Sequence, residues 1–143
     1  MFRIFLDSSV LFSAAYSVKG HSQDLILMGM QEKLKLIVSP FVLEETRRNL
    51  AISAPEKLTT LELILPLIHF EMVHPSKEHV LDAIVYVVLK DAPILAAAKL
   101  AEVDFFVTLD RKHLLGKPAL EVYAKTKIVT PGDAFAFIIE HEQ

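Results

Sequence analysis

The stretch KDAPILAAAKLAEVDFFVTLDRKHL, residues 90–114, predicts a helix followed by a strand and contains three aspartates. The Ala- and Leu-rich run 91–101 is typical of a buried helix, and the DFFVTL run that Asp104 begins is typical of a buried strand. At about 1.5 Å per helical residue and about 3.3 Å per strand residue, the two elements cover comparable lengths in opposite directions. Asp91 and Asp110 are therefore expected at one end of this pair, and Asp104 at the other.

Short strand-like runs alternate with longer helix-like runs along the rest of the chain. Strands are expected at 2–7, 34–39, 70–73, 104–109 and 127–130. Helices are expected at 8–17, 22–33, 40–52, 55–68 with an interruption near Pro66, 91–101 and 131–141. The run 76–89 looks helical in its first half and fits either state in its second half. This alternation indicates an α/β fold with a parallel sheet covered by helices on both faces.

Composition limits the class of protein. The 143 residues suit one domain, 1–143, and 52% of them are hydrophobic, which predicts a large core. There is no Cys, so disulfides and Cys-based zinc sites are excluded. No run resembles a signal peptide or is long enough to span a bilayer, and we expect a cytoplasmic protein. The net charge of −3 does not by itself indicate nucleic-acid binding.

Four acidic positions converge on one edge of the predicted sheet. The carboxyl ends of parallel strands lie at one edge, where such folds bind ligands. Asp7 and Asp110 each end a strand, Asp91 lies at the same end, and Glu44 and Glu45 follow the second strand. Helical periodicity alone does not decide between the two glutamates. Clustered carboxylates repel one another unless a cation is present, and oxygen ligands favour Mg²⁺ or Mn²⁺ over zinc.

Each of these residues also has a structural interpretation. The three aspartates stand where helices can begin, and Asp is a favoured N-cap residue. A glutamate on a surface helix is ordinary. The hydroxyl groups of Ser9 and Thr108 could orient metal ligands or water, or could serve only capping and strand packing.

Five basic residues adjoin the acids in the sequence: Arg47, Arg48, Lys90, Arg111 and Lys112. Basic side chains around an acidic, metal-binding centre suit a phosphodiester substrate, because cations attract the phosphate backbone. Taken one at a time, the same residues are better explained as solvated, weakly paired surface charges. The histidines at 69, 74, 79, 113 and 141 have no ligand-like spacing, and no role is assigned to them.

Four segments of the chain resemble PIN-domain nucleases, and together they span nearly its whole length. They are FLDSSVLFSA at 5–14, VSPFVLEETRRNL at 38–50, KDAPILAAAKLAEVDFFVTLDRKHLL at 90–115 and IVTPGDAFAFI at 128–138. The resemblance implies a three-layer α/β/α sandwich with a parallel five-stranded sheet in the order 3-2-1-4-5. It also implies hydrolysis of RNA phosphodiester bonds with Mg²⁺ or Mn²⁺.

In this family the second acidic position lies six residues after a serine, which matches Glu45 counted from Ser39. Asp7, Asp91 and Asp110 match the other three acidic positions. Many similar chains are VapC-type toxins of toxin–antitoxin pairs, often homodimeric and silenced by an antitoxin protein. The segment 55–89 departs from the compact toxin pattern.

Two other functions are compatible with an α/β chain of this kind. The first is a catalytically idle PIN-type module that binds RNA or protein, for which loss of one or more of the four acids is expected. The second is a receiver-type signalling domain, which also has an acidic Mg²⁺ pocket at the strand ends. Receivers place paired acids after the first strand, whereas Asp7 is followed by two serines, and FEMVHPS at 70–76 offers no phosphate-accepting aspartate.

Overall fold

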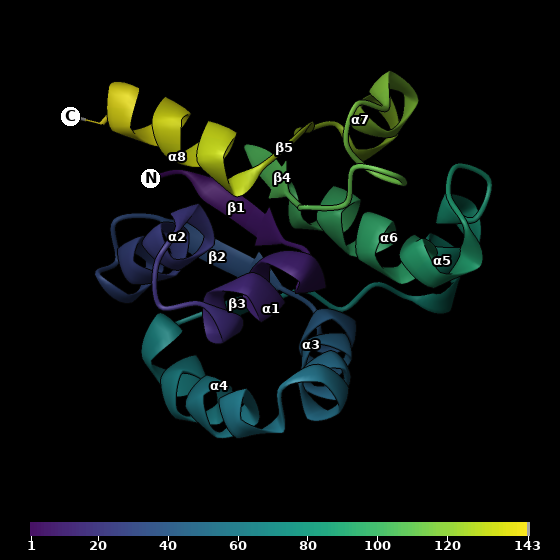
Figure 1. Ribbon diagram of the computed structural model, residues 1–143. Helices are drawn as coiled ribbons and strands as arrows, with labels where there is room; N and C mark the ends of the chain where they lie inside the picture. The colour runs from purple at the N-terminus through teal and green to yellow at the C-terminus, as the bar shows by residue number, and fades with distance from the viewer. Residues whose placement is uncertain (143) are drawn as a thin grey trace.

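Five short strands form one parallel sheet in the order β3-β2-β1-β4-β5 in a computed structural model that describes residues 1–142 (Figure 1). The strands are β1 Arg3–Leu6, β2 Lys35–Val38, β3 Glu71–Met72, β4 Phe105–Val107 and β5 Lys127–Val129. The helices are α1 Ser8–Tyr16, α2 His21–Met30, α3 Pro40–Ser53, α4 Pro55–Ile68, α5 Lys77–Ala83, the 3₁₀ turn η1 Leu89–Asp91, α6 Ala92–Ala101, α7 Pro118–Ala124 and α8 Pro131–Glu140. The predicted fold class and strand order are confirmed.

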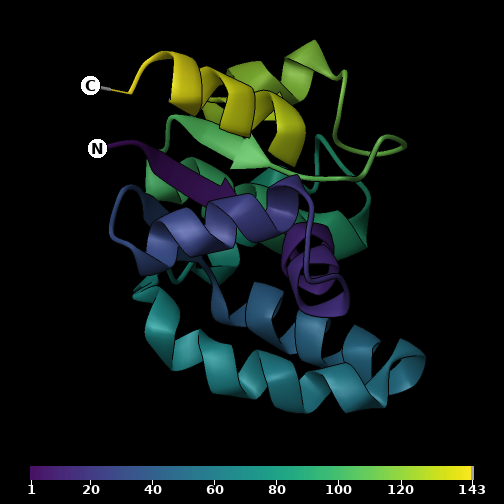
Figure 2. The same cartoon turned by 60° about the vertical axis from the view of Figure 1, so that its left-hand side comes forward.

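Helices cover both faces of the sheet. On one side α2 contacts α1, α4 and α8, and on the other α6 contacts α5 and α7. Figure 2 shows α2 and α8 in front of the central strands and the α5–α6 region behind them. A sheet covered in this way has strands that are apolar on both faces, which explains the continuous RIFL, KLIV and FFV runs.

The core is centred on β1 and β4. Phe5 and Phe106 are fully buried, and their rings meet edge to face with centroids 5.6 Å apart. Gly29 lets α2 approach β2 closely, because a Cβ atom at that position would lie 2.5 Å from Leu36 Cδ1. No helix within residues 1–142 is long and apolar enough to cross a membrane.

Two local expectations are wrong, and one helix was not predicted. Helix α4 runs uninterrupted to Ile68. Pro66 lies in its last turn, where the missing N–H removes only one hydrogen bond and the helix is about to end. The run 76–89 is helical only to Ala83, and its second half forms turns instead of a helix or strand. Helix α7 was not expected, since its seven residues are too short to give a clear apolar period.

The register of the sheet brings the ends of β1 and β4 together. Leu6 pairs with Val107, and the backbone N–H of Asp7 donates to the carbonyl of Val107 at 3.0 Å. Asp7 and Thr108 are therefore neighbours although they are far apart in the sequence. The neighbouring strand, β2, ends at Val38, and the next residue, Ser39, caps α3 because its hydroxyl accepts a hydrogen bond from the backbone N–H of Val42.

Candidate metal centre

The four predicted acids line one cleft of about 490 Å³ at the carboxyl edge of the sheet. Asp7 directly follows β1, Glu45 lies in α3, Asp91 ends the 3₁₀ turn η1 just before α6, and Asp110 lies in the loop after β4. The cleft is also lined by Ser8, Ser9, Phe12, Asn49, Ile52, Ser53 and Lys90. The structure thus brings together the four carboxylates that the sheet topology predicted at one edge.

Asp7 is buried and held by two hydroxyl groups. Its Oδ2 accepts hydrogen bonds from Ser9 Oγ and Thr108 Oγ1, each at 2.7 Å. Within residues 1–142 its side chain makes no capping hydrogen bond to α1, so the N-cap interpretation does not account for it. Burial raises the pKa of Asp7, and the negative charge of Glu45 adds to this effect, whereas the two hydroxyl groups oppose it.

Thr108 connects two of the acids. Its hydroxyl donates to Asp7 and accepts from the backbone N–H of Asp110 at 3.0 Å. Ser9 has a similar role, because its hydroxyl donates to Asp7 and accepts from the backbone N–H of Leu109 at 3.0 Å. The end of β1 and the loop after β4 are therefore joined through these two hydroxyl groups.

Glu44 and Glu45 lie at different positions around the axis of α3, so only one of them faces the cleft. Val42, Thr46 and Leu50 form the buried face of the helix. Glu45 lies beside this face, is partly buried, and accepts a hydrogen bond from Ser8 Oγ. The side chain of Glu44 is 76% exposed and lies 3.9 Å from Arg48, outside the cleft lining.

Asp91 carries a buried carboxylate oxygen that nothing in the described chain satisfies. The residue is 7% exposed, and its Oδ2 has no hydrogen-bond partner within residues 1–142. Its side chain also makes no capping hydrogen bond to α6 among those residues. Burial raises the pKa of Asp91; Lys90 opposes the shift, and the negative charge of Asp110 reinforces it.

Asp110 has a structural role in its own loop as well as a place in the cleft. Its Oδ1 accepts from the backbone N–H groups of Lys112 and His113 at 3.1 and 2.9 Å, so the turn-capping interpretation accounts for one of its oxygens. Its Oδ2 faces Nδ1 of His113 at 3.3 Å.

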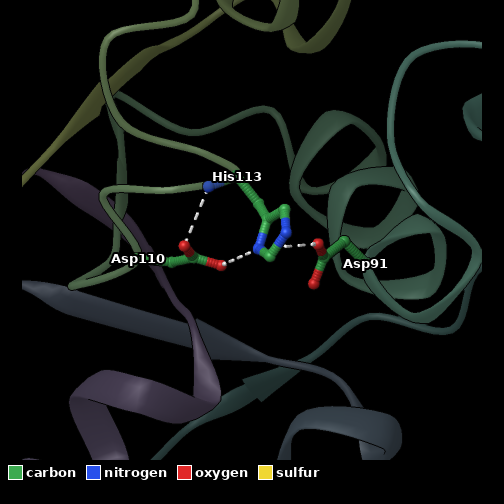
Figure 3. Close-up of side chains that lie close together, drawn as sticks. All are labelled: Asp91, Asp110 and His113. Atoms are coloured by element: carbon green, nitrogen blue, oxygen red, sulfur yellow. Dashed lines mark hydrogen bonds and ion pairs between the residues drawn. The ribbon is translucent and has the colours of Figure 1, made fainter.

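His113 lies between two of the acids, although no role was assigned to it from the sequence. Figure 3 shows its ring between Asp110 and Asp91, and Nδ1 lies 3.9 Å from Asp91 Oδ2. One ligand atom from each of these three residues lies within 4.8 Å of the others. The only sequence signal for His113 was its position three residues after Asp110, since the contact with Asp91 arises from the fold.

The chemistry of this cleft fits a bound divalent cation. Two of its carboxyl groups are buried and have raised pKa values, which means that their charged forms are poorly stabilised by protein atoms alone. The unsatisfied oxygen of Asp91 is a further indication, because buried polar atoms in folded proteins normally have a partner. Carboxylate oxygens are ligands that Mg²⁺ and Mn²⁺ accept.

The five basic residues are dispersed. Lys90 is the one that lines the cleft within the described residues. Arg47 is bound by Glu62 at 2.6 Å, and Arg48 lies beside Glu44. Arg111 and Lys112 are exposed on the loop after β4, where Lys112 lines a separate groove.

Asp104 lies at the opposite edge of the sheet, as expected. Its Oδ2 accepts from the backbone N–H of Arg3 at 2.8 Å, at the amino end of β1. The residue therefore supports the start of β1 and β4, away from the four acids that line the cleft.

The sequence matches the PIN domain family over residues 4–116, most of the chain. The chain belongs to the PIN domain family. Members of this family are typically nucleases. This membership, together with the observed strand order, separates the chain from receiver-type domains. No curated protein matches the sequence.

Several solved structures share the PIN fold of this chain. PAE2754 from Pyrobaculum aerophilum is 19% identical with a TM-score of 0.64, and the alignment covers 98% of this chain and 91% of that chain. VapBC2 from Rickettsia felis, bound to a promoter DNA fragment, is 13% identical with a TM-score of 0.63, covering 90% and 98%. FitAcB from Neisseria gonorrhoeae is 18% identical with a TM-score of 0.58, covering 90% and 98%. At these identities the similarity concerns the fold.

Proposed function

We propose that this PIN-domain chain is a metal-dependent endoribonuclease that hydrolyses RNA phosphodiester bonds at the four-acid cleft. The observation that carries the proposal is the buried, unsatisfied Oδ2 of Asp91 in a cleft shared with three further carboxylates. The retention of all four acids favours catalysis over an idle binding module, in which loss of at least one acid is expected.

The proposed roles follow from burial and position. Asp7, Asp91 and Asp110 would hold Mg²⁺ or Mn²⁺ directly or through water, and Glu45 would orient a water molecule or hold a second ion. When bound, such a cation supplies positive charge to the scissile phosphate and makes a coordinated water more acidic. Ser9 and Thr108 keep Asp7 in place through the hydrogen bonds described above.

Positive charge beside the cleft would attract the RNA backbone. Lys90 is the best placed of the basic residues, because it lines the cleft. Arg111 and Lys112 follow Asp110 on an exposed loop and could contact the strand as it leaves the site. Arg47 and Arg48 would have to leave Glu62 and Glu44 to take part.

The test is cleavage of several RNAs by the purified chain with Mg²⁺, with Mn²⁺ and with EDTA, beside an Asp7→Asn variant. We expect cleavage that requires a metal and falls by at least about a hundredfold in the variant, the scale seen when one electrostatic group is removed from an active site. A folded wild-type chain that cleaves no RNA under any of these conditions would favour the idle binding module.

We also propose that the chain is cytoplasmic and is the toxin of a toxin–antitoxin pair. The support is the resemblance to VapC-type toxins and the similar fold of VapBC2. Co-expression with the protein encoded beside it tests the pairing. An antitoxin should co-purify with the chain and suppress both its RNA cleavage and its toxicity to the host.

A homodimer is the assembly we propose for the chain without its antitoxin. The stretch 81–89 exposes six large apolar side chains: Leu81, Ile84, Val85, Tyr86, Val88 and Leu89. Contiguous exposed apolar surface of this kind commonly marks a protein interface. Sedimentation should give a dimer for the wild type and a monomer for Val85→Asp, and a wild-type monomer would contradict the assignment.

A further inference from the structure

His113 faces two of the four acids, Asp91 and Asp110, from the groove beside the cleft, and the loop that carries it holds its backbone in place. The backbone N–H of His113 donates to Asp110 Oδ1 at 2.9 Å, while its ring faces the other oxygen of the same carboxylate. The side chain of His113 is 27% exposed and that of Asp91 is 10% exposed, and the ring lies between Asp110 and Asp91 (Figure 3).

We propose that Nδ1 of His113 is a third protein ligand of the cation held between Asp91 and Asp110, and that it makes the centre select Mn²⁺ over Mg²⁺. The inference rests on the proposed metal site and concerns which ion that site prefers. Imidazole is accepted more readily by transition metals than by Mg²⁺, which favours oxygen ligands and water. A site with two carboxylates and one imidazole should therefore discriminate between the two ions.

The distances are compatible with a cation bound by His113 and both aspartates. At 3.9 Å, the separation of Nδ1 from Asp91 Oδ2 is too long for a hydrogen bond, and it leaves that buried oxygen unsatisfied. Nδ1 lies 3.3 Å from Asp110 Oδ2 and 3.9 Å from Asp91 Oδ2, and one ligand atom from each of the three residues lies within 4.8 Å of the others. These three residues would therefore be able to hold one cation together.

The alternative is that a protonated His113 only neutralises the two aspartates and leaves when a cation binds. This arrangement would be stable without metal, but it would place no nitrogen on the ion. The two possibilities therefore differ in a property that can be measured without any RNA substrate.

The experiment is pulsed electron paramagnetic resonance of the full chain loaded with Mn²⁺, combined with calorimetric affinities for Mn²⁺ and Mg²⁺. We expect a nitrogen coupling to Mn²⁺ that disappears in His113→Gln. We also expect this variant to lose about tenfold to a hundredfold in Mn²⁺ affinity and less in Mg²⁺ affinity. His141→Gln is the matched control, because His141 lies near Asp104 at the opposite edge of the sheet, and it should keep the coupling.

The outcomes separate this inference from the proposed nuclease. Bound Mn²⁺ without nitrogen coupling in a chain that cleaves RNA would overturn the role of His113 and leave the nuclease intact. Nitrogen coupling in a chain that cleaves no RNA would support His113 and count against the nuclease. Failure of the wild-type chain to bind either ion would overturn both the role of His113 and the proposed nuclease. Circular dichroism and thermal unfolding verify that His113→Gln is folded before its affinities are compared.

Discussion

At the scale of single residues, the side chains around each carboxylate decide what that carboxylate can do. Glu45 and Glu44 have the same chemistry and are neighbours in the chain. One accepts a hydrogen bond from Ser8 inside the cleft, and the other faces solvent beside Arg48. Successive residues of a helix are rotated by about 100° about its axis, so Glu44 and Glu45 face different surroundings.

We expect Glu45→Gln to lower RNA cleavage by about tenfold to a hundredfold, because it removes a charge that faces the proposed cation. Glu44→Gln should stay close to wild type, since its charge is solvated and its ion pair is exposed. Initial cleavage rates at saturating metal compare the two variants directly. The reverse order would mean that Glu44 is the glutamate that acts.

The sequence predicted that the four acids lie at one edge of the sheet, but it gave no indication that His113 lies beside two of them. Asp7 and Asp110 were placed by a rule that holds for any parallel sheet, since both follow strands. His113 is 22 positions from Asp91 in the sequence, and their proximity depends on the path of the loop after β4. No spacing rule describes such a loop, so the sequence offered no basis for pairing these residues.

At the scale of elements, the ends of β1 and β4 act as one unit because Thr108 joins them. We expect Thr108→Val to weaken metal binding by about tenfold to a hundredfold, because Asp7 loses a donor and the backbone N–H of Asp110 loses an acceptor. The free energy of unfolding should fall by about 1–3 kcal/mol, the cost of unsatisfied buried polar groups. Calorimetry and urea unfolding measure the two effects.

Thr46→Val is the matched control for this variant. Thr46 is also fully buried, but its hydroxyl donates to the carbonyl of Val42 in its own helix, at 2.7 Å. It should leave metal affinity close to that of the wild type. Equal losses of affinity in the two variants would show that Thr108 acts through general stability and not through the two aspartates.

At the amino ends of β1 and β4, by contrast, we expect a substitution to leave RNA cleavage unchanged. Asp104→Asn should keep RNA cleavage close to the wild-type rate, because Asp104 lies across the sheet from the cleft. Asp104→Ala should lower the free energy of unfolding by about 1 kcal/mol, since the backbone N–H of Arg3 loses its partner. A folded Asp104→Asn chain that cleaves no RNA would refute the placement of the active site at the carboxyl edge.

Element boundaries were predictable where the apolar pattern was long and ended in a clear signal. Helix α3 follows Ser39 and begins at Pro40, which is a typical start, and it was placed within one residue of its end. The apolar residues after Ala83 suggest a regular element, whereas most of the large side chains there are exposed on a turn. An apolar sequence pattern does not by itself show whether the side chains are buried in the same chain, so the sequence could not identify this run as a turn.

At the scale of the whole molecule, the fold gathers four carboxylates in one cleft at the carboxyl edge of the sheet, and this links stability to pH and to the proposed metal. The pKa values of Asp7 and Asp91 are both raised above the ordinary value of 3.8, chiefly by burial. The folded chain then binds protons more tightly than the unfolded chain. Without metal, the contribution of these two groups to stability is fully present below that pH and is lost as pH rises through the raised values.

We therefore expect the free energy of unfolding, measured in urea with EDTA, to fall less steeply above pH 4 in Asp7→Asn/Asp91→Asn than in the wild type. Mn²⁺ should reverse the difference, because a cation at one hundred times its dissociation constant stabilises the wild type by about 2.7 kcal/mol and has no site in the double variant. Parallel pH profiles for the two proteins in EDTA would show that neither aspartate carries a raised pKa. Equal stabilisation of both proteins by Mn²⁺ would show that the ion binds elsewhere, so the two comparisons test the electrostatics of the cleft and its occupancy separately.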